Sequence, residues 1–369
     1  MRPFPAAPAF AEDLFTVGVT GTNGKTSTTF LTAALLATIA RPVAKVTTLG
    51  SFLDDEAIVV PPGYEGFLET MRRGLARGGR YAAVEFTSEA LALGAARGWP
   101  ARIAVFTNIS HDHLDAHASM EAYLASKAQL FMHLPAGGTA ILNGCDEGAS
   151  LIDGVVPEGV TKVRYGLRSR ADAWCALDLA ARGVTFDWSG THIGLEPSRL
   201  AGDVTTLTTR AVGAIFAENA LAAFAAGIAA GVPAELCART IAEQAPLAGR
   251  FERVAEHPDV VVDYAHSPDA LERTLATARA LCGGRVTLVF GAGGDRDRKK
   301  RPLLGAAAAA ADRVILTSDN PRSEDPRDIA AALREGLGAH ADVRVELDRA
   351  RAIAMAVEDA GDGDLVLIA

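Results

Sequence analysis

Short apolar runs of β-branched and aromatic residues alternate along the chain with longer stretches rich in alanine and leucine. The first pairs are LFTVGVT with TSTTFLTAALLATIA, YAAVEF with SEALALGAAR, and ARIAVFTNI with SMEAYLASKAQLFMHL. β-branched residues favour strands, whereas alanine and leucine favour helices. Strands that alternate with helices in this way are typical of βα units, so the pattern predicts an α/β fold on a mostly parallel sheet.

The alternation changes in the middle of the chain and then resumes. Between about 161 and 211, short strands such as VTFDWS and VTTLTTR are separated by Gly and Asp turns, which predicts a smaller antiparallel part, and the helix AENALAAFAAGIAAG follows. A second α/β series contains VVVDYA, a helix over about Pro268–Leu281, RVTLVFGAG, an alanine-rich helix over 305–311, and RVILTSD.

Pro246 and Gly249 mark the break between the two series. We therefore expect a lead-in over residues 1–12, a central P-loop domain over 13–246 and a Rossmann-like α/β domain over 247–369. This division agrees with a length prior of about 150 residues per domain.

Composition narrows the classes of partner. Lys and Arg total 36 against 45 Asp and Glu, a formal charge of -9, which argues against a nucleic acid partner. The four cysteines form no C-x-x-C pair, so neither a disulfide framework nor a cysteine zinc site is indicated. The apolar run AALLATIA is far shorter than the roughly 18 residues that cross a bilayer. We expect a soluble cytoplasmic protein without a membrane partner, of unspecified oligomeric state.

The stretch TVGVTGTNGKTSTT joins an apolar strand to a helix, which is the setting of a phosphate-binding loop. Gly21 and Gly24 allow backbone amides to face an anion, Lys25 adds a positive charge, and Thr26 can hold Mg²⁺ through its hydroxyl. The strict motif has glycine where this chain has Val19, so the loop is a variant. A plain glycine-rich turn is the alternative, but the strand, the Gly-Lys-Thr and the helix together favour phosphate binding.

The segment SHDHLDAH concentrates three histidines and two aspartates after ARIAVFTN. Metallo-β-lactamase-type hydrolases use H-x-H-x-D-H, and the spacing here is one residue longer. A hydrolase would also leave the phosphate loop without a role. His111 and His117 are readily explained as solvent-facing or capping residues, and Asp112 and Asp115 as groups that orient a neighbour or start the next helix.

Taken together, these segments resemble the Mur ligases, the amide-forming enzymes of peptidoglycan synthesis, and their folate-polyglutamate relatives. The phosphate loop is followed, in the family's order, by VEFTSEAL, FTNISHDHLDAHASMEAYLASKAQLF, NGCDE, ENALAA, GRFERV, VVDYAHSPDAL, FGAGGDRDRKKRPLLG and DNPRSEDPR. They are most similar to the branch that adds a diamino acid to UDP-N-acetylmuramoyl-L-alanyl-D-glutamate. The resemblance implies an ATP- and Mg²⁺-dependent ligase that joins a small-molecule carboxylate to an amino acid.

The resemblance also implies which residues bind ATP and metal. The implied nucleotide residues are Gly21, Thr22, Asn23, Gly24, Lys25, Thr26, Ser27, Asn219, Arg250, Asp263 and His266. Asn219 would face the base, and Arg250 would reach the phosphates when the two domains close. The implied metal-site residues are Thr26, Glu85, His113 and Lys127.

Lys127 resembles a lysine that carbon dioxide converts to a carbamate in this family, giving a carboxylate that can orient Mg²⁺. This reaction requires the uncharged amine. The alternative is a solvated lysine on a helix that also carries Tyr123 and Phe131. The expected catalytic residues are Lys25, His113, Lys127 and Arg250.

On the amine side, Arg322 in DNPR resembles the arginine that binds the distal carboxylate of meso-diaminopimelate, a natural use of a bidentate guanidinium. Arg296, Asp319 and Asn320 are expected beside it. The nearby EDPRDI is better explained as a turn whose aspartate, at position 325, caps the helix that follows.

On the carboxylate side, the expected residues are Thr47, Thr48, Thr87 and Ser88. The chain departs from the family here, because Glu89 stands where the family has histidine and Ala95 where it has arginine. A new carboxylate and a lost guanidinium disfavour a pyrophosphate. We also expect that the family's UDP-binding domain and its late Gly-Lys-Gly-His-Glu segment are absent. The prediction is a ligase with an altered donor site, with the muramoyl dipeptide ligase and a non-catalytic ATP-binding partner subunit as alternatives.

Overall fold

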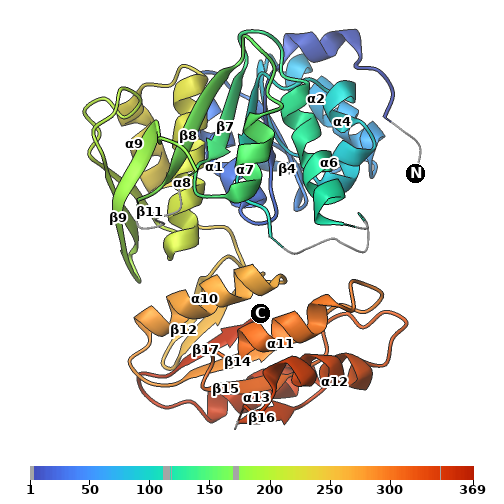
Figure 1. Cartoon of the computed structure of the whole chain (residues 1–369), viewed down its shortest axis with the longest axis vertical. Coiled ribbons are helices and arrows are strands. Elements are labelled where there is room, and N and C mark those ends of the chain that lie inside the picture. The colour runs from blue at the N-terminus through green and yellow to red at the C-terminus, as the bar shows by residue number, and fades with distance from the viewer. Residues whose placement is uncertain (1–3, 111–116, 118, 169–173, 341) are drawn as a thin grey trace.

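The computed structural model describes residues 4–110, 117, 119–168, 174–340 and 342–369. They form two stacked parts, each built on its own sheet (Figure 1). The larger, N-terminal part ends with helix α9, and the smaller part contains everything that follows.

The larger sheet has eleven strands in the order β11-β10-β9-β8-β7-β6-β1-β5-β2-β3-β4. Their bounds are β1 Phe15–Thr20, β2 Val43–Thr47, β3 Gly50–Leu53, β4 Glu56–Ile58, β5 Tyr81–Glu85, β6 Ile103–Phe106, β7 Thr139–Asn143, β8 Thr161–Leu167, β9 Leu179–Asp187, β10 Gly190–Leu195 and β11 Thr206–Thr209. The strands from β9 through to β2 pair in parallel, and the two edges are antiparallel. The predicted mostly parallel sheet with a smaller antiparallel part is confirmed, although the antiparallel strands extend the main sheet and the β3–β4 edge was not predicted.

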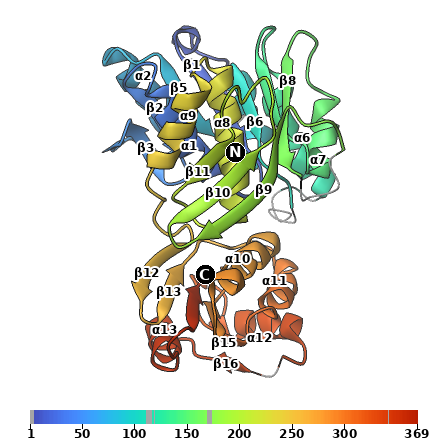
Figure 2. The same ribbon diagram turned by 90° about the vertical axis from the view of Figure 1, so that its left-hand side faces the viewer.

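Helices cover both faces of this sheet (Figure 2). One face packs against α1 Lys25–Leu36, α8 Ala214–Ala229 and α9 Ala234–Glu243. The other packs against α2 Tyr64–Ala76, α3 Ser88–Ala92, α4 Ala95–Gly98, α6 Met120–Met132 and α7 Glu147–Asp153. Strand β6 is a continuous apolar run because helices cover both of its faces. Ile103 and Val105 contact the first helix layer, whereas Ala104 and Phe106 contact the second.

The stretch SEALALGAAR forms two short helices, α3 and α4, where the pattern predicted one. Gly94 separates them and has φ +90°, a left-handed conformation that glycine adopts without steric cost. A 3-10 helix over Ala9–Asp13, near the start of the chain, packs against the residue that follows α4. The break directs Trp99, just after α4, into the core cluster of this face.

The smaller sheet has the order β12-β13-β17-β14-β15-β16, and only β12 and β13 pair antiparallel among its described strands. Its strands are β12 Glu252–Glu256, β13 Asp259–Val262, β14 Val286–Phe290, β15 Arg313–Leu316, β16 Val343–Val345 and β17 Leu365–Ile368. Its helices are α10 Pro268–Leu281, α11 Lys300–Ala308, α12 Pro326–Leu337 and α13 Arg349–Glu358. No helix in the described part of the chain is long and apolar enough to cross a membrane.

Capping residues and prolines in the sequence predict the starts of α10 and α12 correctly. The predicted helix Pro268–Leu281 is α10 with the same bounds, because Ser267 caps it through the Ala270 amide. Helix α12 begins at Pro326, as predicted, and the Asp325 carboxylate accepts a hydrogen bond from the Arg327 amide at 2.8 Å. The alanine-rich helix α11 begins and ends earlier than expected.

Candidate functional site

The phosphate loop lies between β1 and α1, at the carboxyl end of a central strand of the larger sheet. Gly21 has φ +151° and Gly24 has φ +83°. A Cβ at Gly21 would lie 1.9 Å from Thr107 Oγ1, and one at Gly24 would lie 2.2 Å from Asn219 Oδ1. Both positions therefore require glycine, and the loop leads directly into the N-terminus of α1 at Lys25, where backbone amides can face an anion.

Two residues that sequence analysis did not single out hold this loop in shape. Asn108 accepts a hydrogen bond from the Asn23 amide at 2.9 Å through its side chain and from the Thr22 amide at 2.8 Å through its carbonyl. Thr107 Oγ1 donates to the Asn23 carbonyl at 2.7 Å. Both directly follow β6, so the signal was a polar pair at the carboxyl end of a strand beside the loop.

Glu85, the last residue of β5, connects the start of α1 to the turn between β2 and β3. Its Oε2 accepts hydrogen bonds from Thr26 Oγ1 at 2.9 Å and from the Thr48 amide at 3.2 Å. A hydroxyl and a carboxylate oxygen at a phosphate loop are ligands that Mg²⁺ prefers, so this pair fits a nucleotide-bound Mg²⁺. His113, the third expected ligand, lies outside the described residues. Among those that are described, no three His, Cys, Asp or Glu side chains cluster as a metal site.

Lys127 lies inside the protein beneath the phosphate loop, and it is only 1% exposed. Its Nζ donates to the Gly21 carbonyl at 2.6 Å and lies 4.2 Å from the centroid of the Tyr123 ring. The Tyr123 hydroxyl is in turn 3.2 Å from Thr22 Oγ1. The alternative of a solvated helix lysine is therefore wrong. His117 lies beside Tyr123, with 5.2 Å between the ring centroids and an angle of 42° between the ring planes.

The expected nucleotide residues from the second half of the chain do meet the phosphate loop. One cleft is lined by Asn23, Gly24, Thr26, Ser27, Asn219, Arg250, Asp263 and His266, among others. Its volume is about 40 Å³, whereas small-molecule sites measure roughly 300–1,000 Å³. ATP therefore requires these side chains to move apart.

Two polar contacts join the smaller part of the chain to the larger part, one at the phosphate loop and one at α8. Asn23 Nδ2 donates to Asp269 Oδ2 at 2.9 Å, which ties the loop to the first turn of α10. Arg273, one turn further along α10, pairs with Glu218 of α8 at 2.6 Å, and both side chains are largely buried. These contacts therefore help to fix how the two parts of the chain lie relative to each other.

Asp263 fixes the turn that presents Arg250. Its Oδ2 accepts a hydrogen bond from the Phe251 amide at 2.7 Å, and its Oδ1 accepts one from Thr274 Oγ1 at 3.2 Å. Burial raises the pKa of this carboxyl group above its ordinary value. The Arg250 guanidinium lies 5.0 Å from the centroid of the Tyr264 ring. Asp263 thus lines the cleft, but both of its oxygens are used to hold the protein backbone and α10.

The expected amine-side residues also converge. A Cβ at Gly293 would lie 3.2 Å from Arg322 Nη1 and 3.8 Å from Arg296 Cγ, so the two arginines flank the same glycine. Asn320 and Arg322 have φ +43° and +51°, left-handed values that are uncommon outside glycine and that turn this loop sharply. The Arg322 guanidinium donates to the Gly294 carbonyl. Asp319 lies at the start of the same loop.

An ion pair beneath these arginines holds the loop in place. Glu324 accepts from Arg301, whose side chain is 4% exposed, at 2.7 Å, and from the Asp295 amide at 2.6 Å. The Arg301 hydrogen bond is the main reason that the pKa of Glu324 falls to about 2. This pair is not evident from the sequence, because its partners lie 23 residues apart.

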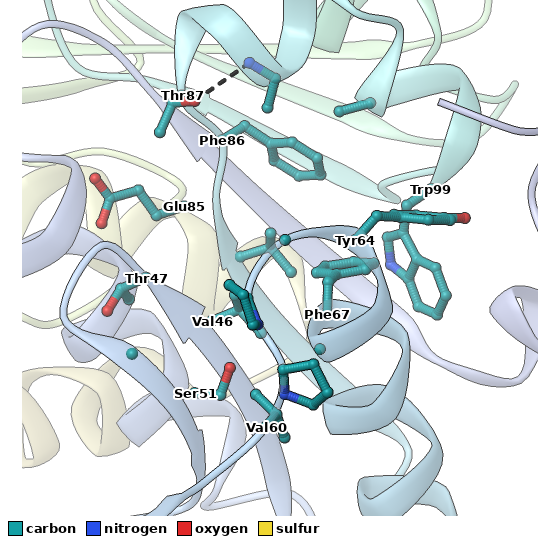
Figure 3. Close-up of a pocket in the computed structure, with 18 of the residues that line it drawn as sticks. Val46, Thr47, Ser51, Val60, Tyr64, Phe67, Glu85, Phe86, Thr87 and Trp99 are labelled. Atoms are coloured by element: carbon teal, nitrogen blue, oxygen red, sulfur yellow. Dashed lines mark hydrogen bonds between the residues drawn. The ribbon is translucent and has the colours of Figure 1, made fainter. Parts of the chain in front are cut away.

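The carboxylate-side residues border a separate pocket of about 520 Å³, shown in Figure 3. Thr47, Thr87 and Glu85 line it, and Thr48 bonds to Glu85. Ser88 does not line the pocket, because it is buried and its hydroxyl donates to Glu89 at 3.3 Å. Most of the wall is apolar and was not predicted. The available signals were the run IVVPPG and two aromatic residues three positions apart at the start of α2.

Comparisons with known proteins agree with this geometry. Residues 19–227 match the Mur ligase middle domain, and residues 249–369 match the Mur ligase glutamate ligase domain. The chain is 40% identical to a UDP-N-acetylmuramoyl-L-alanyl-D-glutamate--2,6-diaminopimelate ligase of Solibacter usitatus, over 97% of this chain and 72% of that protein. It is 39% identical to the enzyme of the same name from Synechococcus elongatus, with the same coverage of both chains.

Solved structures give the same result. A structure of a UDP-N-acetylmuramoyl-L-alanyl-D-glutamate--2,6-diaminopimelate ligase matches with a TM-score of 0.66 and 31% identity, over 96% of this chain and 72% of that chain. A folylpolyglutamate synthase of Mycobacterium tuberculosis, complexed with ADP, matches with a TM-score of 0.75 over 97% and 88% of the two chains, and at 20% identity it supports the fold alone. The chain therefore belongs to the Mur ligase family, the ATP- and Mg²⁺-dependent ligases that form amide bonds.

Proposed function

We propose that this chain activates a carboxylate substrate as an acyl phosphate and then joins it to the amine of a diamino acid. The observation that carries the proposal is the convergence of Thr26, Glu85 and Lys127 on the phosphate loop, with the 520 Å³ pocket opening on the other side of Glu85. A carboxylate bound in that pocket could approach the end of the triphosphate directly.

The reaction has two balanced steps. A carboxylate oxygen attacks the γ-phosphorus of ATP while the bond from that phosphorus to ADP breaks. The amine nitrogen then attacks the acyl carbon, the carbon–oxygen bond to phosphate breaks, and the nitrogen loses a proton. Lys25 and Arg250 would stabilise the charge on the transferring phosphoryl group. Mg²⁺, held at Thr26 and Glu85, would neutralise phosphate charge.

In this proposal, Lys127 helps to position the metal. Its Nζ lies 2.6 Å from the Gly21 carbonyl, so the side chain already points to the phosphate loop. As a carbamate it would carry a carboxylate towards the metal, and His113 would complete the metal site. As an amine it would act only as a hydrogen-bond donor to the loop.

The two arginines that flank Gly293 favour an acceptor with a carboxylate remote from its reacting amine. The relatives named above act on 2,6-diaminopimelate, which has this form. Their carboxylate substrate, UDP-N-acetylmuramoyl-L-alanyl-D-glutamate, is the first donor to test, because the similarity extends over 97% of this chain.

The test is ADP release from the purified chain with ATP, Mg²⁺, bicarbonate, meso-diaminopimelate and a carboxylate donor, omitting each component in turn. The proposal predicts that release requires both the donor and the acceptor and that the amide product forms in equal amount. ATP binding without donor-dependent ADP release, for every donor tried, would instead support a non-catalytic ATP-binding subunit.

A further inference from the structure

Helix α10 lies on the side of the smaller part that faces the larger part of the chain (Figure 1). Polar side chains at every fourth position of this helix contact the larger part, namely Asp269, Arg273 and Thr277. Residues with this spacing lie on one face of a helix. At Gly213, just before α8, an added Cβ would lie 2.8 Å from Thr277 Oγ1, so the backbone there approaches α10 closely. One polar face of α10 therefore packs on the larger part.

The contact at the phosphate loop uses both ends of one side-chain amide. Asn23 Nδ2 donates to Asp269 Oδ2 at 2.9 Å, and Asn23 Oδ1 accepts from Ser267 Oγ at 3.4 Å. Ser267 is buried, and its hydroxyl also caps α10 by accepting from the Ala270 amide. Since the residues after β6 hold the Asn23 backbone, the start of α10 is fixed relative to the phosphate loop.

Further along, α10 contacts the turn that carries Arg250. Thr274 Oγ1 donates to Asp263 Oδ1 at 3.2 Å, and Asp263 Oδ2 accepts from the Phe251 amide at 2.7 Å. Phe251 has φ +48°, a left-handed value that is uncommon for a large side chain and that surrounding contacts must maintain. The position of α10 therefore helps to determine where this turn lies, and Arg250 with it.

The Asp269 and Arg273 side chains lie outside the nucleotide cleft. Ala270 and Thr274 of α10 line that cleft, whereas Asp269 and Arg273 line a different cavity of about 440 Å³. Tyr264, which also lines the cleft, is 65% exposed and can move without disturbing the contacts of Asp269. The link from the phosphate loop through α10 is therefore compatible with a bound nucleotide.

We infer that Asp269 is a positioning residue for phosphoryl transfer. By binding Asn23, it sets the position of α10 on the phosphate loop. Through the contact of α10 with Asp263, it holds the turn that presents Arg250 to the phosphates. This inference rests on the proposed function, in which Arg250 stabilises the transferring phosphoryl group.

Asp269→Ala should lower kcat about 10-fold to 100-fold, because displacement of a catalytic group by about 1 Å can cost about 100-fold. Asp269→Asn keeps an oxygen that can accept from Asn23, so this variant should recover most of the activity. Glu272→Ala is the matched control, because Glu272 is exposed on the same helix and should leave kcat unchanged. Initial rates of ADP release measure kcat, and thermal unfolding establishes that each variant folds.

If Asp269 acts through Arg250, the effects of the two substitutions should not add. Arg250→Ala removes the guanidinium, so Asp269→Ala should lower kcat by less than about twofold more in that background. Losses that add in full would show that Asp269 acts by another route, and they would overturn the inference.

Hydrogen exchange tests the same link without catalysis. The Phe251 amide is protected by its bond to Asp263. Asp269→Ala should therefore speed exchange in peptides that contain Phe251 by at least about fivefold, and Glu272→Ala should not. Unchanged exchange in Asp269→Ala overturns the inference, whatever the activity.

The two readouts separate this inference from the proposed function. Faster exchange with a non-additive loss of kcat supports both. Donor-dependent ADP release in the parent chain, together with additive losses or unchanged exchange, overturns the inference and leaves the ligase function intact. If the parent chain gives no donor-dependent ADP release, the proposed function fails, and the role of Asp269 in phosphoryl transfer fails with it, even where exchange shows that the link exists.

Discussion

The phosphate loop and the apolar pocket of Figure 3 lie on opposite sides of Glu85 and differ in almost every physical property. The loop side is built from buried polar groups joined to one another, such as Lys127 to Gly21 and Asn108 to Asn23. The pocket side is built from rings and branched aliphatic side chains whose polar atoms are satisfied elsewhere. One side is fixed by directional hydrogen bonds and the other by shape and apolar area.

The contrast explains how one ligase fold can accept different carboxylate substrates. The triphosphate and its metal are the same in every turnover, so directional contacts to them can be retained without regard to the substrate. The carboxylate substrate varies, and an apolar wall can change its selectivity through side-chain volume alone. Variants on the phosphate side should therefore change turnover or metal dependence, and variants on the recognition side should change the affinity for one substrate.

The largest effect is expected from Lys127→Met. Loss of a preorganised polar group at the phosphate loop should lower kcat by about 100-fold to 1,000-fold. The matched control is Lys45→Met, because Lys45 is another buried lysine, 3% exposed, that lies 3.8 Å from the centroid of the Phe30 ring, where burial lowers its pKa. Steady-state ADP release checks both variants. Full activity in Lys127→Met would show that Lys127 has no role in catalysis.

Glu85→Gln should raise the Mg²⁺ concentration that gives half-maximal activity by about 10-fold to 100-fold. The reason is that Gln keeps the size of the side chain and removes the charge that attracts the metal, while the contact with Thr26 can persist. Magnesium titration of the initial rate measures this shift. Glu65→Gln, on the exposed face of α2, should leave the titration unchanged. An unshifted curve in Glu85→Gln would contradict the metal assignment.

Arg322→Lys should raise the KM for meso-diaminopimelate about tenfold and leave the KM for ATP unchanged, because a lysine cannot form the bidentate contact. Initial rates against each substrate separate the two constants. The control is Arg327→Lys, since Arg327 is exposed in the first turn of α12. Equal changes in both constants would show that Arg322 serves folding or nucleotide binding and not amine recognition.

A separate effect concerns the pH dependence of stability and Asp146, which accepts a hydrogen bond from the Ile109 amide at 2.9 Å on the loop side. Burial raises its pKa from 3.8 to about 6, so the folded protein keeps a proton that the unfolded chain releases between these values. The free energy of unfolding should therefore fall by about 1–3 kcal/mol as pH rises through this window and stay level above it.

Asp146→Asn should remove that dependence. Urea unfolding of both proteins at several pH values between 4 and 7 measures the difference, in which the contributions of the other titrating groups cancel. If the two stabilities run parallel across this range, then the Asp146 carboxyl group is not the source of the pH dependence.

The phosphate side could be predicted largely from sequence, because its main residues are contiguous in TGTNGKTS and its helix follows at once. Arg296 and Arg322 were also predicted, and the structure brings them to one glycine. By contrast, the burial of Lys127 depends on Gly21, a partner 106 residues away. A pattern within one segment of the sequence cannot reveal a contact over that separation.

The apolar pocket beside Glu85 could not be predicted from the sequence for a related reason. Its wall collects side chains from β2, the loop before α2, α2 itself, β5 and the residue after α4. Each of these contributes between one and four apolar residues, which are also consistent with an ordinary core. The antiparallel edge strands were incompletely predicted because strand order depends on pairing between distant segments. Helix α10 was predicted well because its cap and its first proline are local signals.

The acyl phosphate step can be tested with a donor whose carboxylate is labelled with ¹⁸O, in a reaction with ATP, Mg²⁺ and meso-diaminopimelate. An acyl phosphate transfers one carboxylate oxygen to phosphate, so mass spectrometry should find one ¹⁸O in the inorganic phosphate for each amide formed. Label in AMP, or unlabelled phosphate alongside the amide product, would contradict the acyl phosphate mechanism.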